Sequence, residues 1–348
     1  MRRLFAILIT ALALLSVAQA AEIVAADSAT LTPIEHRRGA EQTYLTYPEW
    51  FLVHSPAELA TYMQHRPPSE FPFIGHIKQF WQGYGAVYAA TKDDYPFNFG
   101  YHVMVMVIGV STSVEYALKF TYETLIGRVT ESLRTNGMTE EDVLAANVAQ
   151  DYVDFIRVLP WYEYDFSAKL SQLWHATSLY GPDMLRKWER KYALTTEFGI
   201  KAIYGAIIKK LTKMSYEAPR MTTLTVLNHL PPEASATLPE LKVLETYKSG
   251  AVLVSIPRYD AYKSNALTLA KLGADFIEIA GNRSTILVSV LAPANWQAMA
   301  ATPVLFTQPI LSQPQTKRVV MAVKVAQLRM VLTSYSQAPF ELEHVYDY

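Results

Sequence analysis

Apolar residues recur at helical spacing through roughly the first 218 positions of the chain. In the segment 73–91, for example, Ile77, Phe80, Tyr84 and Tyr88 would share one face of a helix. A helix start is also marked at Thr139, where Asp142 three residues later gives the spacing of a capping box. These patterns predict an all-helical N-terminal domain that occupies residues 40–218.

The pattern changes after Pro219, where alternating and β-branched runs replace the helical stripes. Such runs include "TLTVLNHL", "AVLVSIPR", "TILVSVLA" and "RVVMAVKV", and helical segments alternate with them. This order predicts an α+β fold, with a C-terminal ferredoxin-like sandwich over residues 221–348. We detect no internal repeat. Domains of this type pair edge to edge, so a homodimer through the C-terminal domain is a further expectation.

The most apolar stretch of the mature chain is "GYHVMVMVIGVSTSVEYALKF", residues 100–120. No Asp, Glu, Lys or Arg occurs between Asp94 and Glu115, an interval of about 30 Å of helix. Three hydroxyl residues follow Val110, and Glu115 and Lys119 continue the helix as an i,i+4 pair. We therefore predict a buried central helix. A membrane span at 101–118 and a helix in the membrane interface are the alternatives.

One face of this predicted helix carries small and polar side chains. It begins at His102 and continues through Gly109, Ser113, Tyr116, Phe120 and Gly127. Glycines on such a face predict close packing against a neighbouring helix.

The N-terminus has the pattern of a secretory signal peptide. Arg2 and Arg3 precede the apolar run 4–17, and Ala18-Gln19-Ala20 supplies small residues for cleavage. We predict a signal peptide at 1–20, a flexible leader at 21–39 and a periplasmic location.

Composition limits the chemistry that the chain can perform. Of its 348 residues, 51% are hydrophobic and 18% charged, and the net charge is −1. The charge gives no reason to expect nucleic-acid binding. Zero cysteines exclude disulfides, a thiolate nucleophile and cysteine metal ligands. The chain also lacks the GxSxG and SxxK motifs of serine nucleophiles.

Imidazole and carboxylate side chains give a candidate metal site in the helical domain. Glu49, His54, His76 and His102 are ligands of the type that Zn²⁺ or non-haem iron prefers. Their spacing matches no HExxH pattern, so the other interpretation is four side chains held by hydrogen bonds in an aromatic core.

Aromatic and acidic residues alternate in "VLPWYEYDF", residues 158–166. Stacking rings beside carboxylates are typical of glycan-binding clefts. We therefore take Trp161, Tyr162, Glu163, Tyr164 and Asp165 as candidate ligand-binding residues. The alternative is a loop packed on the ends of helices.

Two segments carry opposite charge. Residues 139–165 are acidic, and residues 183–217 form a basic amphipathic helix. Either the two segments are neighbours whose charges complement each other, or the basic helix lies on an anionic membrane surface.

These features predict an exported periplasmic protein that binds a ligand or partner and associates peripherally with the inner membrane. A periplasmic enzyme with a Zn or Fe site, and an integral membrane protein with one span at 101–118, are the alternative functions.

Overall fold

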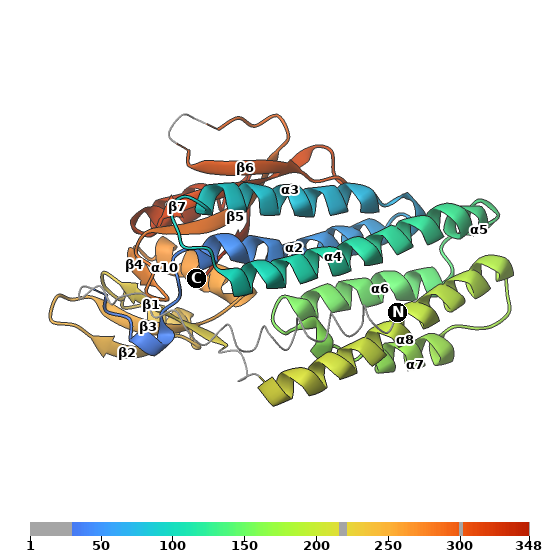
Figure 1. Ribbon diagram of the computed structural model, residues 1–348, viewed down its shortest axis with the longest axis horizontal. Coiled ribbons are helices and arrows are strands. Elements are labelled where there is room, and N and C mark those ends of the chain that lie inside the picture. The colour runs from blue at the N-terminus through green and yellow to red at the C-terminus, as the bar shows by residue number, and fades with distance from the viewer. Residues whose placement is uncertain (1–29, 216–220, 299–301, 348) are drawn as a thin grey trace. The chain divides into compact units, whose positions relative to one another are not determined.

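The computed structural model describes residues 30–215, 221–298 and 302–347 (Figure 1). The predicted signal peptide and residues 21–29 of the predicted leader lie outside this range. Helices occupy the first part and strands the second, so the predicted mixed fold and the order of its two halves are confirmed.

The first half of the described chain, up to residue 215, is helical, and its helix at residues 73–91 has the predicted bounds. The helices of this half are α2 (Gln42–Met63), α3 (Phe73–Thr91), α4 (Phe99–Tyr122), a π-helical turn (Glu123–Gly127), α5 (Arg128–Ser132), α6 (Glu140–Ile156), α7 (Phe166–Ala176) and α8 (Met184–Ser215). Short 3-10 turns occur at Ile34–His36, Pro68–Glu70 and Trp161–Glu163. The capping box that begins α6 is confirmed, because the Thr139 hydroxyl accepts from the Asp142 amide and the Asp142 carboxylate accepts from the Thr139 amide.

Two compact units divide the chain, and neither is continuous in sequence. The sheet unit comprises Met1–Glu49, Trp81–Val105 and Ala218–Tyr348, and the helical unit comprises Trp50–Phe80 and Met106–Glu217. The sheet unit therefore combines the strands with segments from the helical half of the chain. The predicted boundary near residue 219 lies outside the described residues.

The strands of the sheet unit form two antiparallel sheets of four strands each. The first contains β1 (Thr222–Leu227), β2 (Lys242–Thr246), β3 (Val252–Pro257) and β4 (Phe276–Ile279). The second contains β5 (Thr285–Pro293), β6 (Val304–Pro309), β7 (Thr316–Lys324) and β8 (Glu341–Val345). The central pairs are β1 with β3, where Thr225 lies opposite Val254, and β5 with β7, where Val288 lies opposite Met321.

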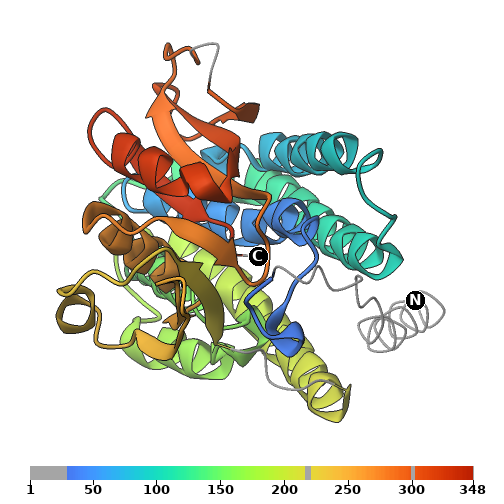
Figure 2. The same ribbon diagram turned by 90° about the vertical axis from the view of Figure 1, so that its left-hand side faces the viewer.

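The two sheets repeat one topology. Their strand orders are β2-β3-β1-β4 and β6-β7-β5-β8, so each sheet places its strands in the order second, third, first, fourth. A helix precedes the last strand in both, namely α10 (Asp260–Lys271) and α11 (Leu328–Ser334), and these helices lie side by side (Figure 2). The shorter α9 (Ala234–Thr237) joins β1 to β2. Apolar residues of both sheets and both helices share one core. The sequence analysis missed this internal repeat.

Residues 30–38 are docked on the first sheet, which corrects the prediction of a flexible leader for this segment. The amides of Leu31 and Thr32 donate to the Glu278 carboxylate at 2.8 and 2.9 Å, and the Thr32 hydroxyl donates to it at 2.8 Å. Glu278 is fully buried, and the Arg38 amide donates to the Ala280 carbonyl. Buried charged hydrogen bonds therefore hold this segment in place.

We expect Glu278→Ala to release residues 30–38 and to lower the free energy of unfolding of the sheet unit by about 2–4 kcal/mol, because three hydrogen bonds to a buried carboxylate are lost. Trypsin should then cleave faster after Arg37 and Arg38. The matched control is Glu240→Ala at an exposed position. Equal cleavage rates in the two variants would contradict the structural role of Glu278.

The first turns of α2 also belong to the sheet unit, where they contact the second sheet. The Thr43 hydroxyl accepts from the Leu287 amide at 2.9 Å, and the Tyr47 hydroxyl donates to Gln308 Oε1 at 2.7 Å. Segments that precede α4 are thus bonded to strands that follow α8.

Candidate functional site: an apolar surface over buried charges

Helix α4 is not the buried core helix that the sequence predicts. Together with the π turn and α5 it forms a continuous helix of 34 residues, Phe99–Ser132, whose most apolar window has a mean hydropathy of 1.5. Only 17% of that window is buried. By length and composition this is the one helix among the described residues that could cross a membrane.

The exposed face of α4 is an apolar stripe. Met106, Val110, Val114 and Leu118 recur at intervals of four residues, and Leu118 is 67% exposed. The stripe continues at Leu125 in the π turn and at Val129 and Leu133 after it. On the predicted packing face, His102, Gly109, Tyr116 and Gly127 are buried as expected, but Phe120 is exposed.

Helix α8 presents a second apolar stripe. Five apolar side chains on one face of this helix are at least half exposed. They follow helical spacing and are Leu185, Trp188, Tyr192, Ile200 and Ile203. Arg186, Lys187, Arg190 and Lys191 of the same helix are buried instead.

Four charged side chains connect α4 to α8. Lys119 Nζ lies 3.2 Å from Glu115 and 2.9 Å from Glu197, and Lys201 Nζ lies 3.2 Å from Glu115 and 2.8 Å from Glu197. This ring of two cations and two carboxylates, the charge quartet, is partly exposed. Leu118 and Ile200 each precede a quartet lysine by one residue, so the two apolar stripes flank the quartet on one surface.

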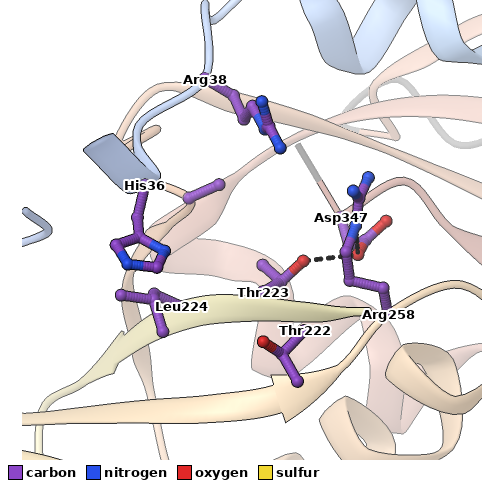
Figure 3. Close-up of a pocket in the computed structure, with 8 residues that line it drawn as sticks. His36, Arg38, Thr222, Thr223, Leu224, Arg258 and Asp347 are labelled. Atoms are coloured by element: carbon purple, nitrogen blue, oxygen red, sulfur yellow. Dashed lines mark hydrogen bonds and ion pairs between the residues drawn. The ribbon is translucent and has the colours of Figure 1, made fainter. Parts of the chain in front are cut away.

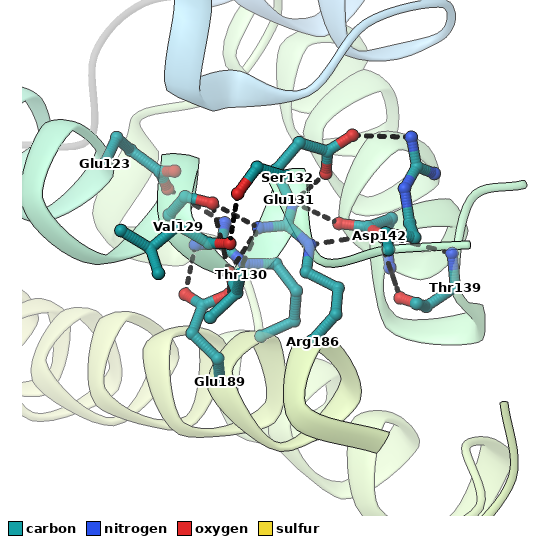
Figure 4. Close-up of polar contacts among 12 residues, drawn as sticks. Glu123, Val129, Thr130, Glu131, Ser132, Thr139, Asp142, Arg186 and Glu189 are labelled. Atoms are coloured by element: carbon teal, nitrogen blue, oxygen red, sulfur yellow. Dashed lines mark hydrogen bonds and ion pairs between the residues drawn. The ribbon is translucent and has the colours of Figure 1, made fainter. Parts of the chain in front are cut away.

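A larger ionic network is buried inside the helical unit (Figure 4). Arg186, only 1% exposed, lies 2.8 Å from Asp142, 3.1 Å from Glu189 and 3.3 Å from Glu131. Arg190 pairs with Glu189 and lies 2.8 Å from Glu123. The helical unit therefore buries charges that soluble proteins normally keep at the surface.

Two lysines of α8 extend this network to the start of α6. Lys187 lies 2.7 Å from Glu140 and 3.5 Å from Glu141, and Lys191 lies 3.7 Å from Glu141. The interpretation that the acidic and basic segments are complementary neighbours is thus confirmed. The cations of the first turns of α8 face inward, and apolar side chains face outward.

A second buried polar cluster joins α2, α3 and α4 within the helical unit. Ser55 Oγ lies 2.9 Å from His76 Nδ1 and 2.7 Å from the Tyr116 hydroxyl, while His76 Nε2 lies 3.5 Å from Glu58. Serine, histidine and carboxylate stand in the order of a hydrolase triad. All four side chains are buried, however, so we assign the cluster a structural role.

The four predicted metal ligands have separate surroundings. His76 belongs to the cluster above, His54 packs near Trp50, and His102 bonds to the Tyr84 hydroxyl at 2.9 Å through Nδ1. Glu49 is hydrogen-bonded to Tyr101. Within the described ranges, no group of three or more His, Asp or Glu side chains is placed to hold a metal ion.

The predicted ligand-binding residues 161–165 mostly serve packing and capping. Tyr164 is buried and donates to Asp151 at 2.7 Å, Asp165 caps α7 through the Ala168 amide, and Glu163 pairs with Lys209. Trp161 packs against Tyr204 with ring centroids 5.4 Å apart. These contacts fit the alternative of a loop packed on helix ends.

Two pockets occur in the sheet unit. The first lies where residues 36–38 cross β1, and Arg38, Arg258 and Asp347 line it together with His36 and Thr223 (Figure 3). The Thr223 hydroxyl donates to Asp347 at 2.7 Å, and Arg258 lies 3.3 Å from the same oxygen. Its volume of about 10 Å³ has room for one water molecule, so we do not assign it a larger ligand.

The second pocket is larger, about 90 Å³, and lies beside the segment that precedes α4. Aromatic rings and one histidine form much of its wall, and Glu41 and Lys92 add opposite charges.

No family model, curated protein or solved structure shows significant similarity to this chain. Its function must therefore be argued from the geometry of its own residues.

Proposed function

We propose that this protein is an exported binding protein that is held at the periplasmic face of the inner membrane by the apolar surface of its helical unit. The observation that carries the proposal is the inverted polarity of that unit. The interior of the helical unit holds paired charges. Its surface carries most of the large apolar side chains that are exposed in the described part of the chain. Ionisable residues that face the interior and pair with one another are typical of proteins in contact with lipid.

The contacts within the sheet unit favour association with one side of the membrane. Thr32 and Thr43, which precede α4, bond to Glu278 and Leu287, which follow α8. A single span at 101–118 would place these partners on opposite sides of the bilayer. The chain must therefore cross an even number of times or not at all. Among the described residues only the helix Phe99–Ser132 has the composition of a span, so we propose that α4, α5 and α8 lie in the interface.

This proposal changes how the basic helix is expected to meet the membrane. One of the two interpretations of residues 183–217 was a contact between their cations and anionic lipid, but several of those cations have carboxylate partners in the helical unit. We propose that the apolar stripe of α8 contacts the acyl boundary instead, and that its aromatic residues Trp188 and Tyr192 lie at headgroup level.

We expect the double variant Val114→Glu/Leu118→Glu to bind liposomes at least tenfold more weakly than the parent, because burying two apolar side chains in lipid contributes about 3 kcal/mol or more. Flotation of the full chain on a density gradient measures the bound fraction. Met330→Glu is the matched control, since Met330 is an exposed apolar residue of the sheet unit. An equal loss in both variants would contradict a specific membrane surface.

We also propose that each four-stranded sheet, together with its helices, has a ferredoxin-like fold. Support comes from the antiparallel pairing and from the strand order, in which the first and third strands are central and the fourth lies next to the first.

The homodimer stays a prediction, and the exposed edge strand β2 is where a second copy would pair. The metal-dependent enzyme also stays a prediction, without support from the placement of its four ligands.

A further inference from the structure

We propose that the second pocket of the sheet unit binds the headgroup of a zwitterionic phospholipid, with the ammonium among its aromatic rings and the phosphate at Lys92. This inference rests on the proposed function, because a membrane-bound protein meets such headgroups at its surface. The residues that carry the argument are Glu41, Tyr88, Lys92, Tyr95, Phe97 and His102.

Aromatic rings that pack on one another form one part of the pocket wall. Phe97 stacks on His102 with centroids 4.3 Å apart and an angle of 3°, and Tyr88 meets His102 edge to face at 5.6 Å. The hydrogen bond between His102 Nδ1 and the Tyr84 hydroxyl holds the imidazole in place. Aromatic faces attract organic cations, and several rings around one cavity are the usual means of binding an alkylated ammonium.

Charges at the pocket match the two charges of the headgroup. Burial raises the pKa of Tyr95, and the carboxylates of Asp94 and Glu41 raise it further, so negative charge lies close to this ring. On the other side of the zwitterion, Lys92 Nζ is half exposed, and its ion pair with Asp93 is long at 3.9 Å. Glu41 is thus placed for the ammonium, and Lys92 is available for the phosphate.

The location of the pocket favours a lipid over a free solute. Its residues 92–98 lead directly into α4, whose apolar stripe we place in the interface. Phe97 and Phe99 are 61% and 68% exposed at this point, as expected of aromatic side chains at headgroup depth.

The chemistry of the pocket can be tested without a membrane. Phosphocholine, phosphoethanolamine and glycerol 3-phosphate are titrated calorimetrically into the detergent-solubilised full chain. We expect at least one of the two zwitterions to bind, and glycerol 3-phosphate, which lacks the ammonium, to bind at least tenfold more weakly. Glu41→Gln and Tyr88→Ala should each weaken binding at least tenfold. Tyr180→Ala, at an exposed tyrosine of the helical unit, should leave it unchanged.

Liposome flotation separates failure of this inference from failure of the proposed function. If the protein floats on phosphatidylcholine, phosphatidylethanolamine and phosphatidylglycerol liposomes alike, and neither zwitterion binds in solution, the pocket assignment is overturned while membrane association stands. If a zwitterion binds but the protein floats on no liposome, the lipid is overturned as the source and the proposed function fails. If the parent instead floats preferentially on zwitterionic liposomes and the Glu41→Gln variant loses this preference, that result would support both the pocket assignment and the proposed function.

Discussion

Replacing Arg186 with methionine should lower the free energy of unfolding of the helical unit by about 3–5 kcal/mol. The guanidinium is buried and contacts Asp142, Glu189 and Glu131, and its Nη1 also donates to the Gly127 carbonyl and the Thr130 hydroxyl. Methionine fills a similar volume but leaves these carboxylates without the cation. Denaturant unfolding in detergent, followed by tryptophan fluorescence, gives the free energy.

The matched control is Arg157→Met. Arg157 pairs with Asp154 at 3.0 Å, but both side chains are largely exposed, so its loss should cost less than about 1 kcal/mol. A further readout is the titration of Asp142. Burial alone would raise the pKa of this carboxyl, but Arg186 and Thr139 hold it below its usual value, so Arg186→Met should raise it. If the two arginine variants unfold alike, the buried network does not stabilise the helical unit.

Helix periodicity predicted where the helices lie but not which of their faces is inside. The amphipathic helix predicted at residues 183–217 does have an apolar face, which includes Leu185, Trp188 and Tyr192. The usual rule then places that face in the core, and here it is exposed. What reverses the rule is the pairing of charges distant in sequence, such as Arg186 with Asp142, and no local pattern reports such partners.

Some local signals that depend on a few neighbouring residues predicted the structure correctly. The capping box at Thr139 is present, and Gly127 is required for close packing, because a Cβ there would overlap the Glu123 carboxylate. By contrast, Glu278 had no motif, and its role depends on Leu31 and Thr32, far away in the chain. The repeated sheet topology was missed for the same reason, since it is a pattern of strand pairing rather than of residues.

The candidate pocket had a partial signal in the sequence. The run "YPFNFGYH" concentrates aromatic residues before the apolar helix, and it contains Tyr95, Phe97 and His102 of the pocket wall. Tyr88, Lys92 and Glu41 come from other segments, and only the folded chain brings them together.

Glu49 gives the sheet unit a dependence on pH that the sequence did not reveal. Burial raises the pKa of its carboxyl to about 7, although the hydrogen bond from Tyr101 and the charge of Arg258 both act to lower it. Its buried Oε1 accepts no hydrogen bond in the described structure. The folded protein therefore holds a proton on Glu49 at pH values where the unfolded chain has lost it.

The sign of the effect on stability follows from this difference. Between about pH 4.5 and 7 the folded state binds more protons than the unfolded state, so the free energy of unfolding falls as pH rises through this window and is level above it. The full difference is about 3 kcal/mol, because each unit of pKa shift corresponds to about 1.4 kcal/mol.

We therefore expect Glu49→Gln to remove this fall and to be up to about 3 kcal/mol more stable than the parent at pH 8. Tyr101→Phe should act in the other direction. It removes a hydrogen bond that favours the charged carboxylate, so the upper end of the window should move above pH 7. Denaturant unfolding of the three proteins from pH 4 to 9 measures both effects. A parent whose stability is independent of pH in this range would show that Glu49 is charged in the fold, and its contacts with Tyr101 and Arg258 would then outweigh its burial.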